Sequence, residues 1–174
     1  MGMDVIGINP AAEAGEYFRN NVWYWRPLWN YVIDVARDIV NDDVANGCHY
    51  NGGSGLNAEQ AVALADRLDD EIASGRTATY ETAYRARLAA LPRSDCEYCD
   101  GTGVRTDEVG VDLGMPTKAL PVEIAAIVGR EHGYCNGCSG EGRVDHPETG
   151  YPFDVRNVAT FSEFARLSGG FEVW

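Results

Sequence analysis

Hydrophobic residues recur at helical spacing in the first half of the chain and predict three helices. The first is predicted from Pro27 to about Asn41, because Pro suits a first helical turn and an apolar stripe follows it at intervals of three and four residues. That stripe comprises Leu28, Val32, Val35 and Ile39.

The second helix is predicted to begin at Asn57, because an Asn at the N-cap followed three residues later by Gln60 forms a capping box. We expect it to end at Gly75. A third helix is predicted from Thr77 to Leu91, where Pro92 stops it. The second helix has an apolar stripe at Ala61, Leu64, Ala65, Leu68 and Ile72, and the third has one at Tyr80, Tyr84, Leu88 and Leu91.

Extended segments are predicted at both ends of the chain. Residues 3–8, MDVIGI, are β-branched and end at a turn, so we expect a buried strand there. Near the C-terminus, Thr160 and Glu163 are spaced as a capping box, which predicts a short helix ending at the Gly169-Gly170 pair. Residues 171–174, FEVW, alternate as a final edge strand does.

These elements predict a helix-dominated α+β fold, a single domain with a small zinc-knuckle lobe. We expect a mainly helical body at residues 1–92, a zinc-binding lobe with an inserted helix at residues 93–150, and a C-terminal segment, residues 151–174, that packs on the body. The inserted helix is predicted over residues 121–128, PVEIAAIV.

The lobe is predicted from a repeated motif, C-x-x-C-x-G-x-G, at residues 96–103 and 135–142. Two such turns facing each other place four thiolates around one point, which is the usual geometry of structural zinc. Iron–sulfur, paired-disulfide and redox alternatives stay open, but the duplication favours one zinc ion. The predicted ligands are Cys96, Cys99, Cys135 and Cys138, with His132 as a neighbour.

The repeated motif resembles the cysteine-rich module of DnaJ-type chaperones, which carries four such units and binds two zinc ions. This chain has two units, so the resemblance implies one zinc ion. The His-Pro-Asp signature of the J-domain is absent, and the string His146-Pro147-Glu148 stands at the wrong end of the chain. Chaperone function is therefore not implied.

Three further stretches resemble an uncharacterised family of small bacterial and bacteriophage proteins. They are GMDVIGINP at residues 2–10, FRNNVWYWRPLW at residues 18–29 and GSGLNAEQAVALAD at residues 53–66. The resemblance implies a prokaryotic or phage origin and supplies no catalytic residues.

Charge and composition change the range of partners that we expect. The 174 residues carry a net charge of −13, and Lys118 is the only lysine, so direct binding to nucleic acid or to an anionic membrane is disfavoured. No window is apolar enough to span a membrane, and the N-terminal stretch lacks the features of a secretory signal. We therefore expect a cytoplasmic protein.

Two other stretches hold candidate contact residues. Trp23, Trp25 and Arg26 lie in an aromatic cluster that is either core or a platform for a partner. His49 and Asn51 lie in a Gly-rich loop after Cys48, where a Cys/His nucleophile pair or an anion site is conceivable.

The sequence thus favours a zinc-stabilised, non-enzymatic protein-binding or adaptor protein of bacterial or phage origin, with a protein partner. The first alternative is a small-ligand-binding protein or enzyme with a pocket near His49. The second is a phage inhibitor of a host defence or nucleic-acid enzyme that acts through its acidic surface.

Overall fold

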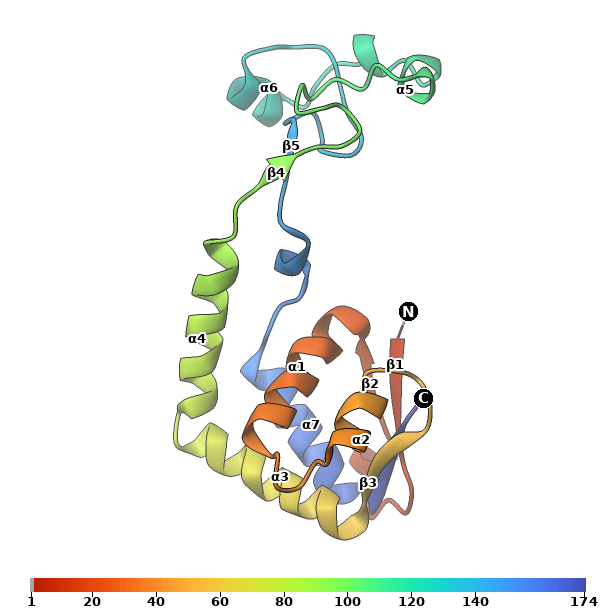
Figure 1. Ribbon diagram of the computed structural model, residues 1–174, viewed down its shortest axis with the longest axis vertical. Helices are drawn as coiled ribbons and strands as arrows, with labels where there is room; N and C mark the ends of the chain where they lie inside the picture. Colours follow the sequence, from red (N-terminus) through yellow and green to blue (C-terminus); the bar gives the residue numbers. More distant parts are fainter. Residues whose placement is uncertain (1) are drawn as a thin grey trace. The chain divides into compact units, whose positions relative to one another are not determined.

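The computed structural model describes residues 2–174 and divides into two compact units (Figure 1). The first unit comprises the chain up to Ala89 together with Gly150–Trp174, and the second comprises Ala90–Thr149. Helices and small antiparallel sheets make up both units, which confirms the predicted α+β class with helices dominant. No helix among the described residues is both long and apolar enough to cross a membrane.

The sheet of the first unit has four antiparallel strands in the order β2-β1-β6-β3. Strand β1 (Gly2–Gly7) forms where residues 3–8 predict it, with alternate side chains buried. The prediction of an edge strand at the C-terminus is wrong, because β6 (Gly170–Val173) pairs with both β1 and β3 (Ser54–Asn57). Strand β2 (Tyr17–Asn21) follows the short 3-10 helix η1 (Glu13–Gly15).

Helix α1 (Val22–Val35) begins before the predicted start, which is a correction. Asn21 is the N-cap, and its side chain accepts a hydrogen bond from the backbone N–H of Tyr24. Pro27 therefore lies inside the helix. The chain leaves the helix after Val35, and Asn41 is the N-cap of a separate short helix, α2 (Asp42–Gly47), rather than the end of the first.

Helices α3 (Ala58–Ala73) and α4 (Arg76–Ala89) confirm the second and third predicted helices. The capping box between Asn57 and Gln60 is present in both directions. Gly75 adopts a φ of +78° just after α3, the left-handed conformation that glycine favours at a helix end.

Helix α7 (Val155–Leu167) is longer than the predicted C-terminal helix. Its N-cap is Asp154, whose carboxylate accepts the backbone N–H of Arg156. The capping box at Thr160 is therefore wrong: its hydroxyl lies in mid-helix and donates to the Arg156 carbonyl. The predicted end is confirmed, since Gly169 and Gly170 both have positive φ.

The core of the first unit lies between the sheet and helices α1, α3 and α7. Helix α7 packs along α3, so the C-terminal segment completes the core of this unit (Figure 1). Aromatic rings from α1, α7 and β6 form much of that core, with Trp25 and Trp29 stacked at 5.4 Å. The largest fully buried side chains are Trp25, Trp29, Phe161, Phe164 and Phe171.

The second unit is small and irregular. Two short paired strands, β4 (Ser94–Asp95) and β5 (Arg143–Val144), lie where the chain enters and leaves it. Between them the chain forms α5 (Glu108–Asp112), the 3-10 helix η2 (Met115–Thr117) and α6 (Val122–Val128). The last of these confirms the helix predicted over residues 121–128. A further 3-10 helix, η3 (Pro147–Gly150), follows β5.

Candidate metal centre

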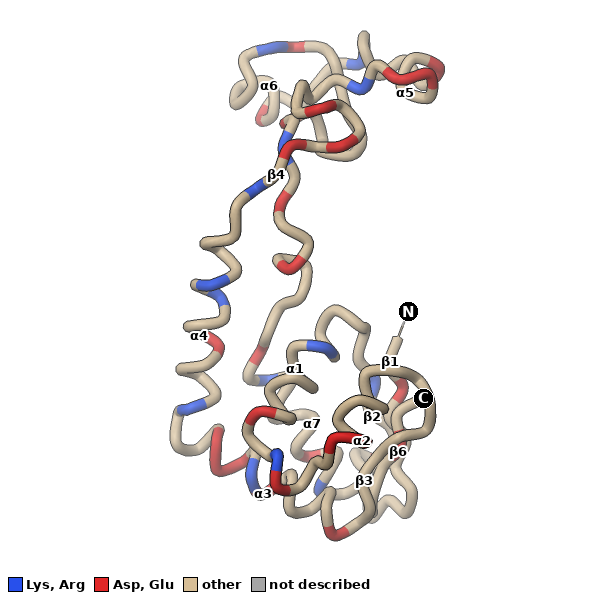
Figure 2. The backbone as a smooth tube through the Cα atoms, in the orientation of Figure 1, with Lys and Arg blue, Asp and Glu red and all other residues tan. Residues whose placement is uncertain are grey.

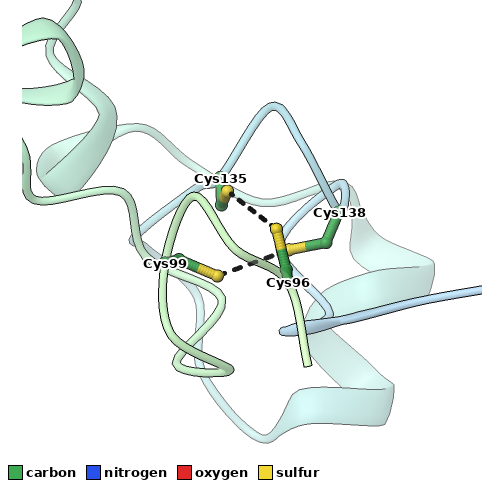
Figure 3. Close-up of side chains that lie close together, drawn as sticks. All are labelled: Cys96, Cys99, Cys135 and Cys138. Atoms are coloured by element: carbon green, nitrogen blue, oxygen red, sulfur yellow. Dashed lines mark hydrogen bonds between the residues drawn. The ribbon is translucent and has the colours of Figure 1, made fainter. Parts of the chain in front are cut away.

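Four cysteine side chains converge in the second unit, as the two motifs predict (Figure 3). All four are buried, and their Sγ atoms lie within 4.8 Å of one another. The Sγ atoms of Cys96 and Cys135 are 3.9 Å apart, and those of Cys99 and Cys138 are 3.7 Å apart. Each of these pairs joins one motif to the other.

The two motifs form nearly identical turns, which we call the first knuckle (residues 96–103) and the second knuckle (residues 135–142). In the first, the backbone N–H of Gly103 donates to Cys99 Sγ at 3.2 Å. In the second, Gly142 donates to Cys138 Sγ at 3.1 Å. Both bonds favour the thiolate form of the sulfur, which is the form that binds a metal.

Glycine is required where the two knuckles meet. A side chain on Gly103 would place its Cβ 2.3 Å from the carbonyl oxygen of Gly140, and one on Gly142 would place it 2.2 Å from that of Gly101. Both Gly103 and Gly142 also have positive φ. The glycines of the repeated motif therefore let the two backbones approach closely enough to face their sulfurs at one point.

The sulfur geometry fits a tetrahedral metal ion. Zinc–sulfur bonds of about 2.3 Å in a regular tetrahedron imply sulfur–sulfur distances of about 3.8 Å. The two pairs that join the knuckles, at 3.9 and 3.7 Å, are close to this value, and all four Sγ atoms lie within 4.8 Å of one another. Four thiolates complete a four-coordinate shell, so such an ion would have no open position for a water or a substrate.

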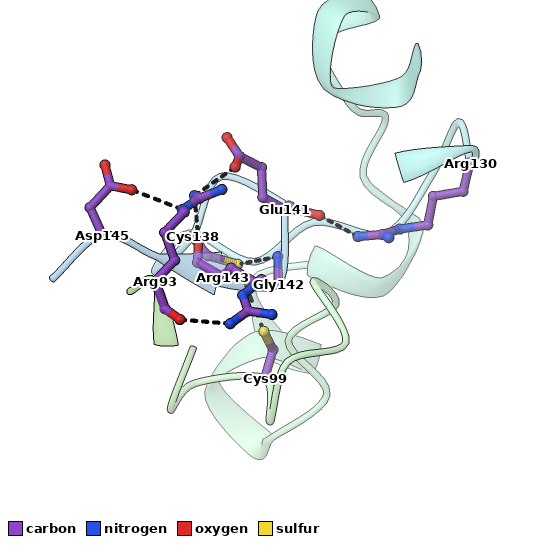
Figure 4. Close-up of polar contacts among 9 residues, drawn as sticks. Arg93, Cys99, Arg130, Cys138, Glu141, Gly142, Arg143 and Asp145 are labelled. Atoms are coloured by element: carbon purple, nitrogen blue, oxygen red, sulfur yellow. Dashed lines mark hydrogen bonds and ion pairs between the residues drawn. The ribbon is translucent and has the colours of Figure 1, made fainter. Parts of the chain in front are cut away.

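Arg93 and Arg143 join the two chain segments that flank the knuckles (Figure 4). Arg93 donates to the carbonyl of Arg143 at 3.0 Å, and Arg143 donates back to the carbonyl of Arg93 at 2.6 Å. Arg93 also forms ion pairs with Glu141 and Asp145. These contacts join the chain just before the first knuckle to the chain within and after the second.

A third arginine, Arg130, joins the two knuckles directly (Figure 4). Its guanidinium donates to the Gly140 carbonyl at 2.5 Å and lies against Gly103. Its Nε is buried with no hydrogen-bond partner among the described residues. Four thiolates around a divalent cation would carry a net negative charge, so a partly buried guanidinium at the knuckles is favourable. The sequence pattern does not single out Arg130, because it lies outside both motifs.

Two of the four cysteine thiols, Cys96 and Cys138, resist ionisation without a metal. Burial raises the pKa of Cys96 and raises that of Cys138 to about 12. At Cys135, burial acts in the same direction, but backbone N–H groups of Gly137 and Cys138 outweigh it and the pKa is lowered. A metal ion must therefore displace protons from at least two of the sulfurs, which makes binding weaker at low pH.

The aromatic candidates separate into core and surface. Trp25 is fully buried, and its indole N–H donates to the Cys48 carbonyl at 2.7 Å, so its proposed partner contact is corrected to a core role. Trp23 is 49 % exposed and packs on Tyr151 at 4.8 Å between ring centroids. Arg26 lies over the same Tyr151 ring at 5.9 Å. Of these three candidates, Trp23 and Arg26 are exposed.

The loop around His49 lacks the geometry of a nucleophile pair. Cys48 is buried and its thiol donates to the Ser54 carbonyl, and burial raises its pKa to about 12. A thiol of that kind is a poor nucleophile. Asn51 donates to the Gly2 carbonyl at 3.2 Å, and burial followed by the charge of Arg26 lowers the pKa of His49. Neither residue lines the groove of about 620 Å³ in this unit, which lies along β2.

Acidic residues are spread along both units and interspersed with arginines (Figure 2). Several are paired: Asp38 with Arg67, Glu71 with Arg76, and Asp69 with Arg166, at 2.8 to 2.9 Å. A carboxylate face on one side of the molecule would favour the inhibitor hypothesis, and these ion pairs do not supply one.

Comparison with known proteins finds no matching family model, curated protein or solved structure. The resemblance to a bacterial and bacteriophage family therefore stays a prediction from the sequence. The cysteine geometry alone supports the likeness of the second unit to a zinc-knuckle module.

Proposed function

We propose that this chain is a non-enzymatic protein-binding adaptor of bacterial or phage origin, acting in the cytoplasm, whose second unit is stabilised by one zinc ion. Cys96, Cys99, Cys135 and Cys138 would hold the ion. The zinc supplies crosslinking and charge neutralisation there, and its closed shell favours a structural role over hydrolytic chemistry.

The small core of the second unit supports this role for the metal. Apart from the four cysteines, Met115 and Leu120 are its buried apolar side chains among the described residues. Such a core is too small to offset the conformational entropy of ordering 60 residues. Zinc binding contributes about 10–16 kcal/mol in small finger peptides, which is of the size required.

The observation that carries the protein-binding role is apolar surface on the segment between the knuckles. Its five large exposed apolar side chains range from 51 % exposed at Val109 to 81 % at Val122. Large exposed apolar side chains on a small unit are candidate contacts for a partner protein where they gather into a patch. They lie on or next to α5 and α6: Val109, Val111, Leu113, Val122 and Ile127.

The test is native mass spectrometry of chain purified from a bacterial host without chelator. We expect one zinc ion per chain and a co-purifying protein. Two double variants locate its contact, Val109→Glu with Leu113→Glu on and beside α5, and Val122→Glu with Ile127→Glu on α6. The matched control is Glu108→Gln with Glu123→Gln, which changes exposed polar residues of the same helices.

At least one double variant should lose the partner while keeping one zinc ion, and the control should keep both. Zinc with a bound small molecule and no protein would contradict the adaptor role. Retention of the partner by both double variants would show that the apolar side chains are not the contact.

A further inference from the structure

The two edges of the sheet in the first unit differ. Strand β3 forms one edge, and α2 lies close to it. Strand β2 forms the other edge and pairs only with β1 among the described strands. Unpaired edges of this kind accept another strand, and proteins commonly protect them.

The backbone of β2 turns hydrogen-bonding groups away from β1. Asp4 exchanges two backbone hydrogen bonds with Trp174, at 2.9 and 2.7 Å, so its N–H and C=O point towards β6. Arg19 lies opposite Asp4 in the register, and in an antiparallel pair it must then point its own groups outward. Tyr17, two residues earlier, points the same way. The free edge thus offers two N–H donors and two C=O acceptors.

A groove of about 620 Å³ runs along this edge. One wall is β2, from Tyr17 to Asn20, and the other comes from α7 and its N-cap, with Tyr24 of α1 also contributing. The residues contributed by α7 and its N-cap are Asp154, Arg156, Asn157 and Thr160.

Two amide side chains in the groove are only partly satisfied. Asn20 is 8 % exposed and donates to Asn157 at 2.9 Å, and that is its one side-chain hydrogen bond within the described part of the chain. The carbonyl oxygen of Asn20 and the amide group of Asn157 are left for another partner. A peptide main chain supplies both a donor and an acceptor.

The charged groups most exposed at the groove are arginines. Arg156 is 91 % exposed and pairs with the far less exposed Asp154, and Arg19 pairs loosely with Asp4 at 3.6 Å. Both guanidinium groups retain free N–H donors that match a carboxylate. The groove therefore favours acidic side chains in its occupant, although the chain as a whole carries −13.

We propose that β2 binds an extended, acidic peptide segment of a partner protein by strand addition. The peptide main chain would bond to Tyr17 and Arg19, and its Asp or Glu side chains would meet Arg19 and Arg156. This is the general mode in which main-chain bonds give affinity and alternate side chains give specificity. This proposal concerns the first unit only, so its test does not depend on the proposed role of the second unit.

A second copy of this chain is the less favourable occupant. Pairing two β2 strands symmetrically about Arg19 would place two guanidinium groups opposite each other, which is destabilising. Two chains of charge −13 also repel each other.

The test starts with a random library of ten-residue peptides selected on the purified full chain, followed by synthesis of the enriched peptides. We expect enrichment of Asp and Glu, and slowed hydrogen exchange at the backbone amides of Tyr17 and Arg19 when a selected peptide is bound. Arg19→Ala removes the guanidinium and keeps the backbone N–H, and should weaken binding about tenfold. Arg19→Pro also removes the outward N–H without breaking the β1–β2 ladder, and should weaken binding at least tenfold more.

A second measurement covers the case in which Arg19→Pro fails to fold. Selected peptides N-methylated at the residues that face β2 should lose binding to the wild-type chain. The proposal is overturned if no acidic peptide is enriched, or if enriched peptides protect other amides. It is also overturned if the Tyr17 and Arg19 amides are protected without peptide in a concentration-dependent way, which would indicate a dimer.

Discussion

At the scale of single residues, Cys99 and Cys48 have the same side chain in different settings. Cys99 lies in the four-sulfur cluster, and Cys48 is buried in the first unit beside Ser54. Cys99→Ser should abolish zinc binding and the cooperative unfolding of the second unit, because three thiolates and a hydroxyl bind zinc far less well. Native mass spectrometry and thermal melting measure the two effects.

Cys48→Ser is the matched control for that substitution. It should keep one zinc ion per chain and lower only the stability of the first unit. Wild-type melting and metal content in Cys99→Ser would refute the four-thiolate site.

The lowered pKa of His49 predicts how the free energy of unfolding of the first unit changes with pH. Its pKa is lowered in the folded chain, first by burial and second by Arg26, so the unfolded chain binds more protons below pH about 6.5. The free energy of unfolding of the first unit should therefore fall as pH drops through 6.5 towards the folded pKa. His49→Gln should lose this part of the dependence, measured by denaturant titration with tryptophan fluorescence.

His132→Gln is the control for His49→Gln, because His132 is an exposed histidine of the second unit. It should keep the wild-type pH profile of the tryptophan signal. An unchanged profile in His49→Gln would show that its protonation is not linked to folding.

At the scale of elements, the two candidate starts of α7 make opposite predictions. Asp154→Ala removes the observed N-cap and should cost about 1 kcal/mol in the free energy of unfolding. Thr160→Ala changes an exposed mid-helix position and should be neutral or slightly stabilising, since Ala has the higher helix propensity. Chemical denaturation of the two variants decides between them, and the reverse order of effects would place the helix start at Thr160.

Helices with strong local signals were predictable from the sequence, whereas the starts of α1 and α7 and the strand neighbours were not. The capping box at Asn57 lies beside a regular apolar stripe, so both signals agree. Pro27 lies inside the helix although proline removes one intrahelical hydrogen bond, so it did not mark the start. The actual cap, Asn21, precedes an aromatic run that obscures the helical period. At residues 171–174, alternation does not distinguish an edge from a central strand, because neighbours come from distant parts of the chain.

At the scale of the whole molecule, the two units should respond differently to metal removal. All four tryptophans lie in the first unit, so their fluorescence reports on that unit alone. A strong zinc chelator should leave the tryptophan emission unchanged while the amides of residues 90–149 become unprotected in hydrogen exchange. The reason is that the core of the first unit contains none of the four cluster cysteines.

Adding back zinc should restore protection in the second unit. A red shift of the tryptophan emission on chelation would contradict the independence of the two units.

The four cysteines of the candidate site could be predicted from the sequence, but the residues around them could not. The spacing of a repeated short motif is local information, so the four cysteines could be named from the sequence. Arg130 and the Arg93–Arg143 pair lie outside the motifs and meet the knuckles only through the fold. The open edge of β2 could not be named either, because it depends on the strand order.

The central position of β6 has a consequence for the order of events during synthesis. The first unit cannot complete its sheet until residues 170–173 leave the ribosome, after the whole second unit has been made. The 60 residues of the second unit connect α4 to the C-terminal segment. If zinc has already joined the two knuckles by then, the flexible part of this connection is only the few residues that flank β4 and β5. Shortening such a loop about fourfold lowers its closure cost by about 1 kcal/mol. The ion would thereby speed the folding of a unit that contains none of its ligands.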